Sequence, residues 1–139
     1  MRKLTKKYIE ELSYEIIGAA IEIHKELGPG LLESIYEKCM IYELELRGLD
    51  VKHQQSVPII YKDMTFDANL RYDLLVEECI IVELKALAQM LPIHDAQAMS
   101  YAHLLKVPKS ILINFTTTNI FQYGQKTFVN KFFKMLPAI

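Results

Sequence analysis

The sequence predicts an α/β fold in which a mixed central β-sheet is flanked by helices. Three observations support this fold class. Apolar residues recur at three- and four-residue steps over residues 12–46, as in amphipathic helices. Apolar and polar residues alternate over residues 66–76, as in a strand with one buried face. A β-branched segment at 80–85, a helical pattern at 93–105 and an apolar strand at 110–115 then follow in the order of a right-handed parallel crossover.

Two helices are expected before the sheet begins. The first ends at Gly28-Pro29-Gly30, because glycine accepts the left-handed cap conformation and proline cannot continue the helix. The second is expected to end near Gly48. Its apolar stripe, which places Cys39 in the core, consists of Leu32, Ile35, Cys39, Tyr42 and Leu46.

The strands are expected from changes in the period of the apolar pattern. Residues 51–61 read as a weak strand, which Pro58 favours at an edge of the sheet. Residues 66–76 form the clearest strand of the chain, with alternating apolar and polar residues. At the end of the chain, residues 119–123 and 127–132 predict a hairpin joined through Gly124.

Composition limits the classes of function. The chain has 139 residues, with 16 Lys and Arg against 17 Asp and Glu, so a single domain over residues 1–139 is expected. The near-neutral charge excludes a protein that holds nucleic acid by bulk positive charge alone. Cys39 and Cys79 are too few for a disulfide scaffold. Because Glu10 and later acidic residues interrupt any signal-like or membrane-spanning stretch, a cytoplasmic protein without membrane contact is expected.

A pair of charges lies in the predicted strand 80–85. Glu83 and Lys85 are two residues apart and therefore share a face. Alone, such a pair is typical of a solvated face. Asp73 on the preceding strand makes a site more plausible, because antiparallel pairing places it opposite Glu83 if the three residues 77–79 connect the strands. The two carboxylates would then repel each other unless positive charge lies between them.

Lys85 supplies part of that positive charge, and a divalent cation would supply the rest. Carboxylate oxygens favour Mg²⁺ or Mn²⁺ over Zn²⁺. An ion held by one or two carboxylates keeps several waters, one of which can become a nucleophile. The lysine could position that water or stabilise the charge that develops in a phosphoryl transition state. The arrangement suits phosphodiester hydrolysis.

Four motifs, in this order along the chain, resemble those of the PD-(D/E)XK nuclease superfamily. Residues 30–36 read Gly-x-x-Glu-x-x-Tyr, the motif that names the GxxExxY family. Asp73 and then Glu83-Leu84-Lys85 follow after a short hairpin. Residues 97–101 match the Gln-x-x-x-Tyr helix motif of the RecB-like branch. The resemblance covers about residues 16–130, and it departs from the superfamily pattern at Tyr72, where the name-giving proline would stand.

The resemblance implies a restriction-endonuclease-like core of order αβββαβ with an extra N-terminal helix. It also implies a hydrolase that cleaves phosphodiester bonds in DNA with Mg²⁺ or Mn²⁺. The implied catalytic residues are Asp73, Glu83 and Lys85. The implied metal ligands are Glu33, Asp73, Glu83 and the backbone carbonyl of Leu84, and the implied supporting residues are Gln97, Tyr101 and Tyr36.

Other roles for these residues remain open. Glu33 stands in the first turn of its helix, where free amides and the helix dipole also favour a carboxylate. Arg71 shares a face with Asp73 and could be its ion-pair partner. Arg71, Lys126 and Lys131 are the expected nucleic-acid contacts. The alternative function is a catalytically inactive module that keeps the nuclease fold and binds nucleic acid or protein. A homodimer or a partner protein could supply the recognition surface that so small a chain lacks.

Overall fold

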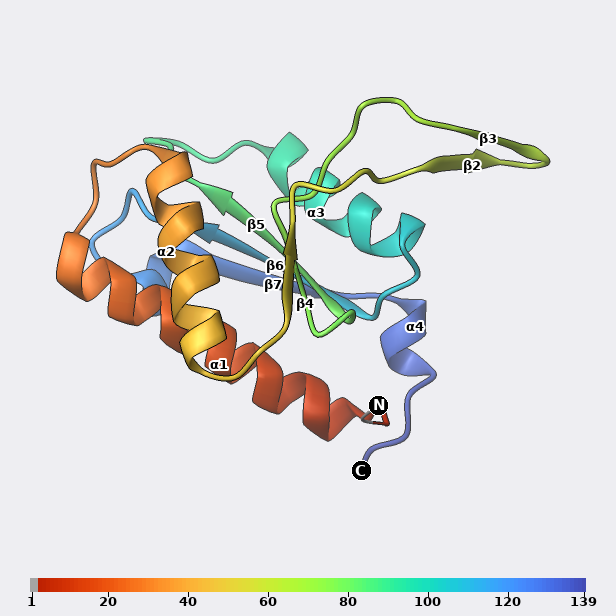
Figure 1. Cartoon of the computed structure of the whole chain (residues 1–139), viewed down its shortest axis with the longest axis horizontal. Helices are drawn as coiled ribbons and strands as arrows, with labels where there is room; N and C mark the ends of the chain where they lie inside the picture. Colours follow the sequence, from red (N-terminus) through yellow and green to blue (C-terminus); the bar gives the residue numbers. More distant parts are fainter. Residues whose placement is uncertain (1–2) are drawn as a thin grey trace.

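The computed structural model describes residues 3–139, and its main feature is a five-stranded mixed sheet of order β1-β4-β5-β6-β7 with flanking helices (Figure 1). Only β5 and β6 run parallel, and the other neighbouring strands are antiparallel. This arrangement confirms the predicted mixed α/β fold. The elements are α1 (Lys6–Leu27), α2 (Glu33–Leu46), β1 (Val51–His53), β2 (Ile59–Tyr61), β3 (Met64–Phe66), β4 (Leu74–Val76), β5 (Ile80–Lys85), α3 (Pro92–Leu104), β6 (Lys109–Asn114), a π-helical turn η1 (Ile120–Gly124), β7 (Gln125–Val129) and α4 (Lys131–Lys134).

The two faces of the sheet carry separate cores. Leu74, Val76 and Val82 face one side, where they join the buried residues of α1 and α2. Leu75 and Ile81 alternate with them and face the other side, where they pack with the buried residues of α3. Because successive residues of a strand point to opposite faces, β4 and β5 are buried on both sides. They therefore form a rigid base for any side chain that lies at their ends.

Helix α1 begins and ends where its sequence signals lie. The side chain of Thr5 accepts a hydrogen bond from the backbone N–H of Tyr8 at 3.0 Å, which caps the first turn. Gly28 takes a positive φ of 71°, and its N–H donates to the carbonyl of His24 at 2.8 Å. The predicted end of the first helix is therefore confirmed. Within residues 3–139, no helix combines the length and the apolar character needed to cross a membrane.

Helix α2 has the predicted extent but buries a different face. Its buried residues are Tyr36, Met40 and Leu44, which recur every four positions. Of the predicted stripe, Cys39 is half-buried, and Leu32, Ile35, Tyr42 and Leu46 are exposed. The expectation that this stripe forms the core is wrong. The helix carries apolar residues on two faces, and the face with Tyr36 packs on the sheet.

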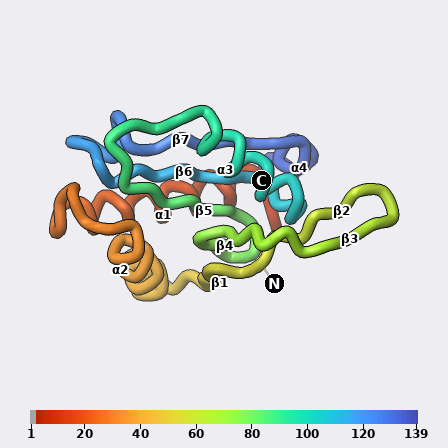
Figure 2. The backbone as a smooth tube through the Cα atoms, turned by 90° about the horizontal axis from the view of Figure 1, so that it is seen from above, coloured from red at the N-terminus to blue at the C-terminus, as the bar shows by residue number. Residues whose placement is uncertain are grey.

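Two predicted strands are each divided in the structure. Residues 51–61 form β1 in the main sheet and β2 in a separate two-stranded sheet, and residues 66–76 contain the end of β3 and all of β4. Gln54 and Asn69 interrupt the extended backbone with positive φ values of 50° and 59°. Strands β2 and β3 pair only with each other and project from the body as an arm (Figures 1 and 2).

The predicted terminal hairpin is also wrong. Residues 120–124 form the π-helical turn instead of a strand, and the Asn119 side chain accepts a hydrogen bond from the N–H of Gln122 at 2.9 Å. Strand β7 pairs with β6 and ends at Val129. Asn130 then caps α4 by accepting from the N–H of Phe132 at 3.0 Å. The side chains of Asn119 and Asn130 accept hydrogen bonds from nearby backbone N–H groups, and this favours a helical turn at positions where the apolar pattern predicts strands.

Candidate functional site

The register of β4 against β5 brings two carboxylates together. Leu75 pairs with Ile81 and Val76 with Ile80, so Asp73 comes opposite Glu83 at the start of β4. Residues 77–79 form the three-residue connection that this register requires, and Glu77 and Glu78 in it both adopt positive φ values. The predicted three-residue connection, which places Asp73 opposite Glu83, is therefore confirmed.

Each of the two carboxylates accepts a hydrogen bond from the backbone of the opposite strand. The N–H of Asp73 donates to Oε2 of Glu83 at 2.7 Å. The N–H of Leu84 donates to Oδ2 of Asp73 at 2.8 Å. Such charge-assisted bonds are short and directional, so they hold both side chains in place without neutralising either charge.

The electrostatics of this pair are unfavourable in the absence of a cation. Glu83 is 4% exposed. Burial raises the pKa of Glu83 to about 8, and the neighbouring charge of Asp73 acts in the same direction. The N–H of Asp73 and the ammonium of Lys85 oppose this shift of the Glu83 pKa without cancelling it. The site therefore favours a bound proton, which a cation would displace.

We expect the stability of the metal-free protein to fall as the pH rises from about 5 to about 8. Glu83 titrates near pH 4.3 in an unfolded chain and near pH 8 when folded, so in this range the folded state binds the extra proton. The free energy of unfolding should therefore decrease by a few kcal/mol as that proton is lost. Urea denaturation in EDTA across this range measures the decrease.

Mg²⁺ added at pH 8 should restore the lost stability, because it replaces the proton as the partner of the Glu83 carboxylate. Glu83→Gln serves as the control, since its amide does not titrate. A wild-type protein whose stability is constant over this range would contradict the environment described for Glu83.

Helix α2 adds two more acidic residues. The charge of Glu33, the first residue of α2, contributes to raising the pKa of Glu83. Burial, followed by the charges of Asp73 and Glu33, raises the pKa of Glu37. The side-chain Nε2 of Gln54 donates to Oε1 of Glu37 at 2.6 Å and to Oδ1 of Asp73 at 3.2 Å. Gln54 therefore links a carboxylate of α2 with one of the sheet.

Glu37 and Gln54 are not among the residues predicted from the sequence. Glu37 follows Glu33 by one helical turn, and this spacing alone could have identified it. For Gln54 the sequence contains no signal, because its contacts depend on how the residues after β1 bend.

Tyr36 of the Gly-x-x-Glu-x-x-Tyr motif fastens the connection between α1 and α2. Its hydroxyl donates to the carbonyl of Gly28 at 2.6 Å and accepts from the N–H of Leu31 at 3.2 Å. Its ring stacks on Phe115, with centroids 4.2 Å apart and planes inclined by 6°. The tyrosine thus fixes the segment that leads into Glu33.

Helix α3 and the end of β5 border the carboxylates. Burial and then the charges of Glu83 and Asp73 raise the pKa of Tyr101, so its hydroxyl lies within the field of the pair. Gln97 is half-buried one turn earlier on the same face of α3. Lys85 is half-buried on the Glu83 face of β5 and forms no ion pair within residues 3–139. Its ammonium therefore remains available to a ligand.

The predicted basic contacts have partners within the described chain. The guanidinium of Arg71 donates to the carbonyl of Gln54 at 3.4 Å, and in the part of the chain that the structure describes it forms no ion pair with Asp73. Lys126 pairs with Asp95 at 3.1 Å. The ammonium of Lys131 lies 5.3 Å from the ring centroid of Phe132. A phosphate at Lys126 would have to compete with a carboxylate.

The donor set of the carboxylate pair fits a hard divalent cation. Asp73 and Glu83 each accept a backbone N–H of the other's strand, and burial together with the charge of Asp73 raises the pKa of Glu83. No three His, Cys, Asp or Glu side chains among residues 3–139 are grouped so that they could hold a metal together. Two carboxylates suit an ion such as Mg²⁺, which keeps much of its water shell.

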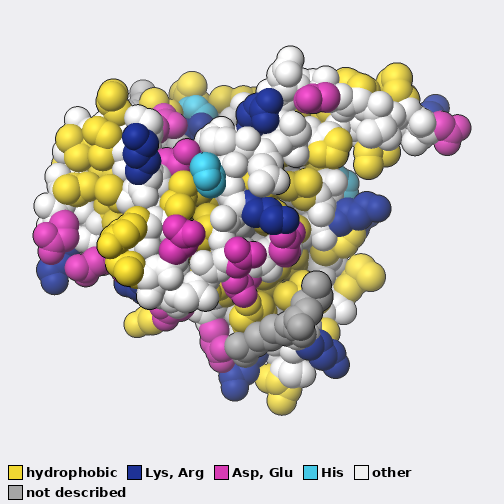
Figure 3. Space-filling view, in the orientation of Figure 1, with side chains coloured by type: hydrophobic (Ala, Val, Ile, Leu, Met, Phe, Trp, Pro, Cys, Tyr) yellow, Lys and Arg dark blue, Asp and Glu magenta, His cyan; other side chains and the backbone are white. Residues whose placement is uncertain are grey.

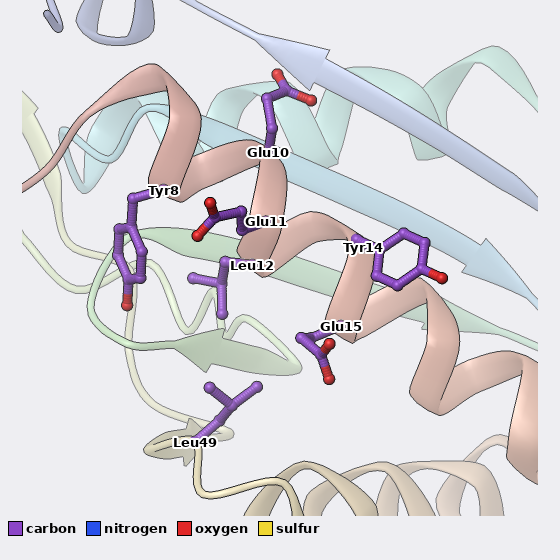
Figure 4. A pocket seen from close by; sticks show the side chains of 7 residues that line it. All are labelled: Tyr8, Glu10, Glu11, Leu12, Tyr14, Glu15 and Leu49. Atoms are coloured by element: carbon purple, nitrogen blue, oxygen red, sulfur yellow. The ribbon is translucent and has the colours of Figure 1, made fainter. Parts of the chain in front are cut away.

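A hollow of about 620 Å³ lies apart from this pair, beside the N-terminal half of α1 (Figure 4). Figure 4 shows Leu12 and Leu49 converging on it, while Glu10 points away. Two of the carboxylates that line it form ion pairs, Glu15 with Arg47 at 3.1 Å and Glu10 with Lys109 at 3.8 Å.

Comparison with known proteins identifies one family. A family model described as the PD-(D/E)XK nuclease superfamily matches residues 10–127. No curated protein and no solved structure matches the chain. The matched range includes the carboxylate pair, the acidic residues of α2 and the whole of α3.

Proposed function

We propose that this chain, which belongs to the PD-(D/E)XK nuclease superfamily, is a metal-dependent nuclease that hydrolyses phosphodiester bonds in DNA. The observation that carries the proposal is the carboxylate pair, Asp73 and Glu83, held by the backbone of opposite strands with Lys85 on the same face. Within the superfamily, the motifs at residues 30–36 and 97–101 support assignment to the GxxExxY family and the RecB-like branch.

In this proposal each residue of the site has a distinct task. Asp73, Glu83 and the carbonyl of Leu84 would hold Mg²⁺ or Mn²⁺, and Glu33, which the described structure does not group with them, is the further ligand that the motif resemblance implies. The ion, when bound, supplies a water of lowered pKa and a positive charge for the phosphate. The ammonium of Lys85 orients the attacking water and stabilises the negative charge that develops on the phosphoryl oxygens.

Helix α3 would bind the substrate beside the ion. Gln97 and Tyr101 lie on one helical face, and the hydroxyl of Tyr101 lies within the field of the carboxylates. Both side chains can donate hydrogen bonds to a phosphate. Arg71, Lys126 and Lys131 would contact the DNA backbone farther from the scissile bond.

The test is cleavage of plasmid and linear DNA by protein stripped of metal with EDTA. Mg²⁺ or Mn²⁺ should restore cleavage. Lys85→Ala should reduce the rate about 100-fold, because it removes a donor aimed at transition-state charge. Lys25→Ala changes an exposed lysine of α1 and serves as the matched control.

Cleavage that is equally fast with EDTA present, or that survives Lys85→Ala unchanged, would refute the proposal. DNA binding that ignores both divalent ions and the acidic residues would instead support the alternative, an inactive binding module with the nuclease fold.

A further inference from the structure

Helix α2 carries a row of apolar side chains that is largely exposed, with only Cys39 packed against the core. The row, here called the α2 stripe, consists of Leu32, Ile35, Cys39, Tyr42 and Leu46. Leu32, Tyr42 and Leu46 are 71%, 67% and 65% exposed. The stripe advances by steps of three, four, three and four residues, which is the spacing of a seam between two paired helices.

The surroundings of the α2 stripe combine apolar and charged side chains. A groove of about 410 Å³ runs between α1 and α2, and Ile23, Leu27, Cys39 and Tyr42 line it together with charged residues at its rim. In Figure 3, hydrophobic side chains gather over the upper left of the molecule, where Figure 1 places the start of α2. Exposed apolar side chains at regular spacing beside such a groove are typical of a protein interface.

The α2 stripe points away from the candidate site. Residues of a helix are separated by about 100° around its axis, so Tyr36, Met40 and Leu44 form the row that faces the sheet. The same geometry places Glu33 and Glu37 beyond that row, on the side opposite the stripe. A partner on the stripe would therefore leave the acidic residues accessible to a substrate.

We propose that the α2 stripe is the contact between two copies of this chain, whose α2 helices pack antiparallel about a twofold axis. A twofold contact must be self-complementary, and the regular spacing meets this condition. In the antiparallel arrangement Cys39 of one copy packs against Tyr42 of the other, and Ile35 packs against Leu46. Each of these contacts occurs twice, and the axis passes between Met40 and Ile41.

The charges beside the stripe favour a second copy in this orientation. The antiparallel arrangement brings Lys38 of each copy beside Glu45 of the other. Both side chains are exposed, and neither has an ion-pair partner among residues 3–139. They stand two helical turns apart within one helix, about 10 Å along its axis, so they cannot pair within one copy. In a parallel arrangement Lys38 would face Glu43, which already binds Arg47 at 2.9 Å.

The first experiment measures the mass of the metal-free protein without DNA by sedimentation, so its outcome does not depend on nuclease activity. We expect twice the chain mass of 16.1 kDa. Leu46→Glu and Tyr42→Glu should each reduce the mass to that of one chain while the circular dichroism spectrum stays that of the folded protein, because both residues are exposed in the monomer. Ile60→Glu, on the arm and 53% exposed, should leave the dimer intact.

A wild-type mass of one chain at every concentration tested would overturn the proposal. So would a dimer that Ile60→Glu dissociates and Tyr42→Glu does not, since the arm would then be the interface.

The second experiment tests the orientation through Lys38 and Glu45. Lys38→Glu and Glu45→Lys should each weaken dimerisation roughly tenfold, because like charges then meet at both ends of the interface. An equimolar mixture of the two variants should form heterodimers of wild-type affinity, since opposite charges meet again. Lys25→Glu, an exposed change on α1, is the matched control. A mixture that associates no better than either variant alone would overturn the antiparallel arrangement.

Discussion

Glu83→Gln is expected to reduce DNA cleavage by about 10³-fold or more while making the metal-free protein more stable at pH 8. Glutamine keeps the shape of the side chain and an oxygen that can accept the N–H of Asp73. It loses the negative charge that would bind a divalent cation and balance the positive charge of that cation. The cleavage rate measured at saturating Mg²⁺ should therefore decrease even though the geometry of the β4–β5 pair is retained.

The gain in stability has the same origin as the loss of activity. Burial and the adjacent Asp73 raise the pKa of Glu83, so the ionised side chain destabilises the folded protein above that pKa. The neutral amide removes both effects, and the free energy of unfolding at pH 8 in EDTA should increase. Opposite changes in rate and stability are typical of a charged group whose energetic cost serves function.

Glu22→Gln provides the matched control for Glu83→Gln, because Glu22 is an exposed residue of α1. It should change neither the cleavage rate nor the stability. A Glu83→Gln variant that retains nearly the wild-type rate, or that is less stable than wild type at pH 8, would contradict the role assigned to this carboxylate.

Tyr36→Ala should cost about 3–5 kcal/mol of unfolding free energy, the largest stability effect that we expect of a single substitution at the motif residues. The side chain is fully buried and stacks on Phe115, so its removal leaves a cavity between α2 and the sheet. The substitution also leaves the carbonyl of Gly28 and the N–H of Leu31 without their hydroxyl partner. Urea denaturation monitored by circular dichroism measures the loss.

Tyr36→Phe separates the two contributions. Phenylalanine keeps the ring and its stacking, and it loses only the two hydrogen bonds, so a cost of about 1–2 kcal/mol is expected. Tyr14→Phe removes a hydroxyl from a tyrosine that is 78% exposed, and it should leave the stability nearly unchanged. If Tyr36→Phe cost as much as Tyr36→Ala, the hydroxyl and not the ring would hold the connection, and the packing argument would be wrong.

The parts of the fold that the sequence predicts correctly depend on local signals. Gly28 ends α1 at a positive φ of 71°, a backbone conformation that favours glycine and that residue type alone indicates. The pairing of Asp73 with Glu83 follows from parity, since the alternation of side chains and the number of connecting residues together determine which faces meet. Neither inference requires knowledge of distant contacts.

The parts that fail depend on tertiary structure. Alternation over residues 66–76 does not reveal that Asn69 turns the chain, so the sequence does not indicate the arm. Helix α2 has two apolar faces, and composition alone could not show whether Tyr36 or Tyr42 faces the sheet. Gln54 reaches Glu37 and Asp73 only because the chain bends after β1. Such contacts between segments remote in sequence leave no local pattern.

The short connection between β4 and β5 also limits how this chain can evolve. Inserting or deleting one residue there would shift the pairing by one position and turn Asp73 toward the face opposite Glu83. Substitutions in the connection should be tolerated far more readily than changes in its length. Proteins that descend from this chain and keep the carboxylate pair are therefore expected to vary in the residue types of this hairpin. The number of its connecting residues should stay odd.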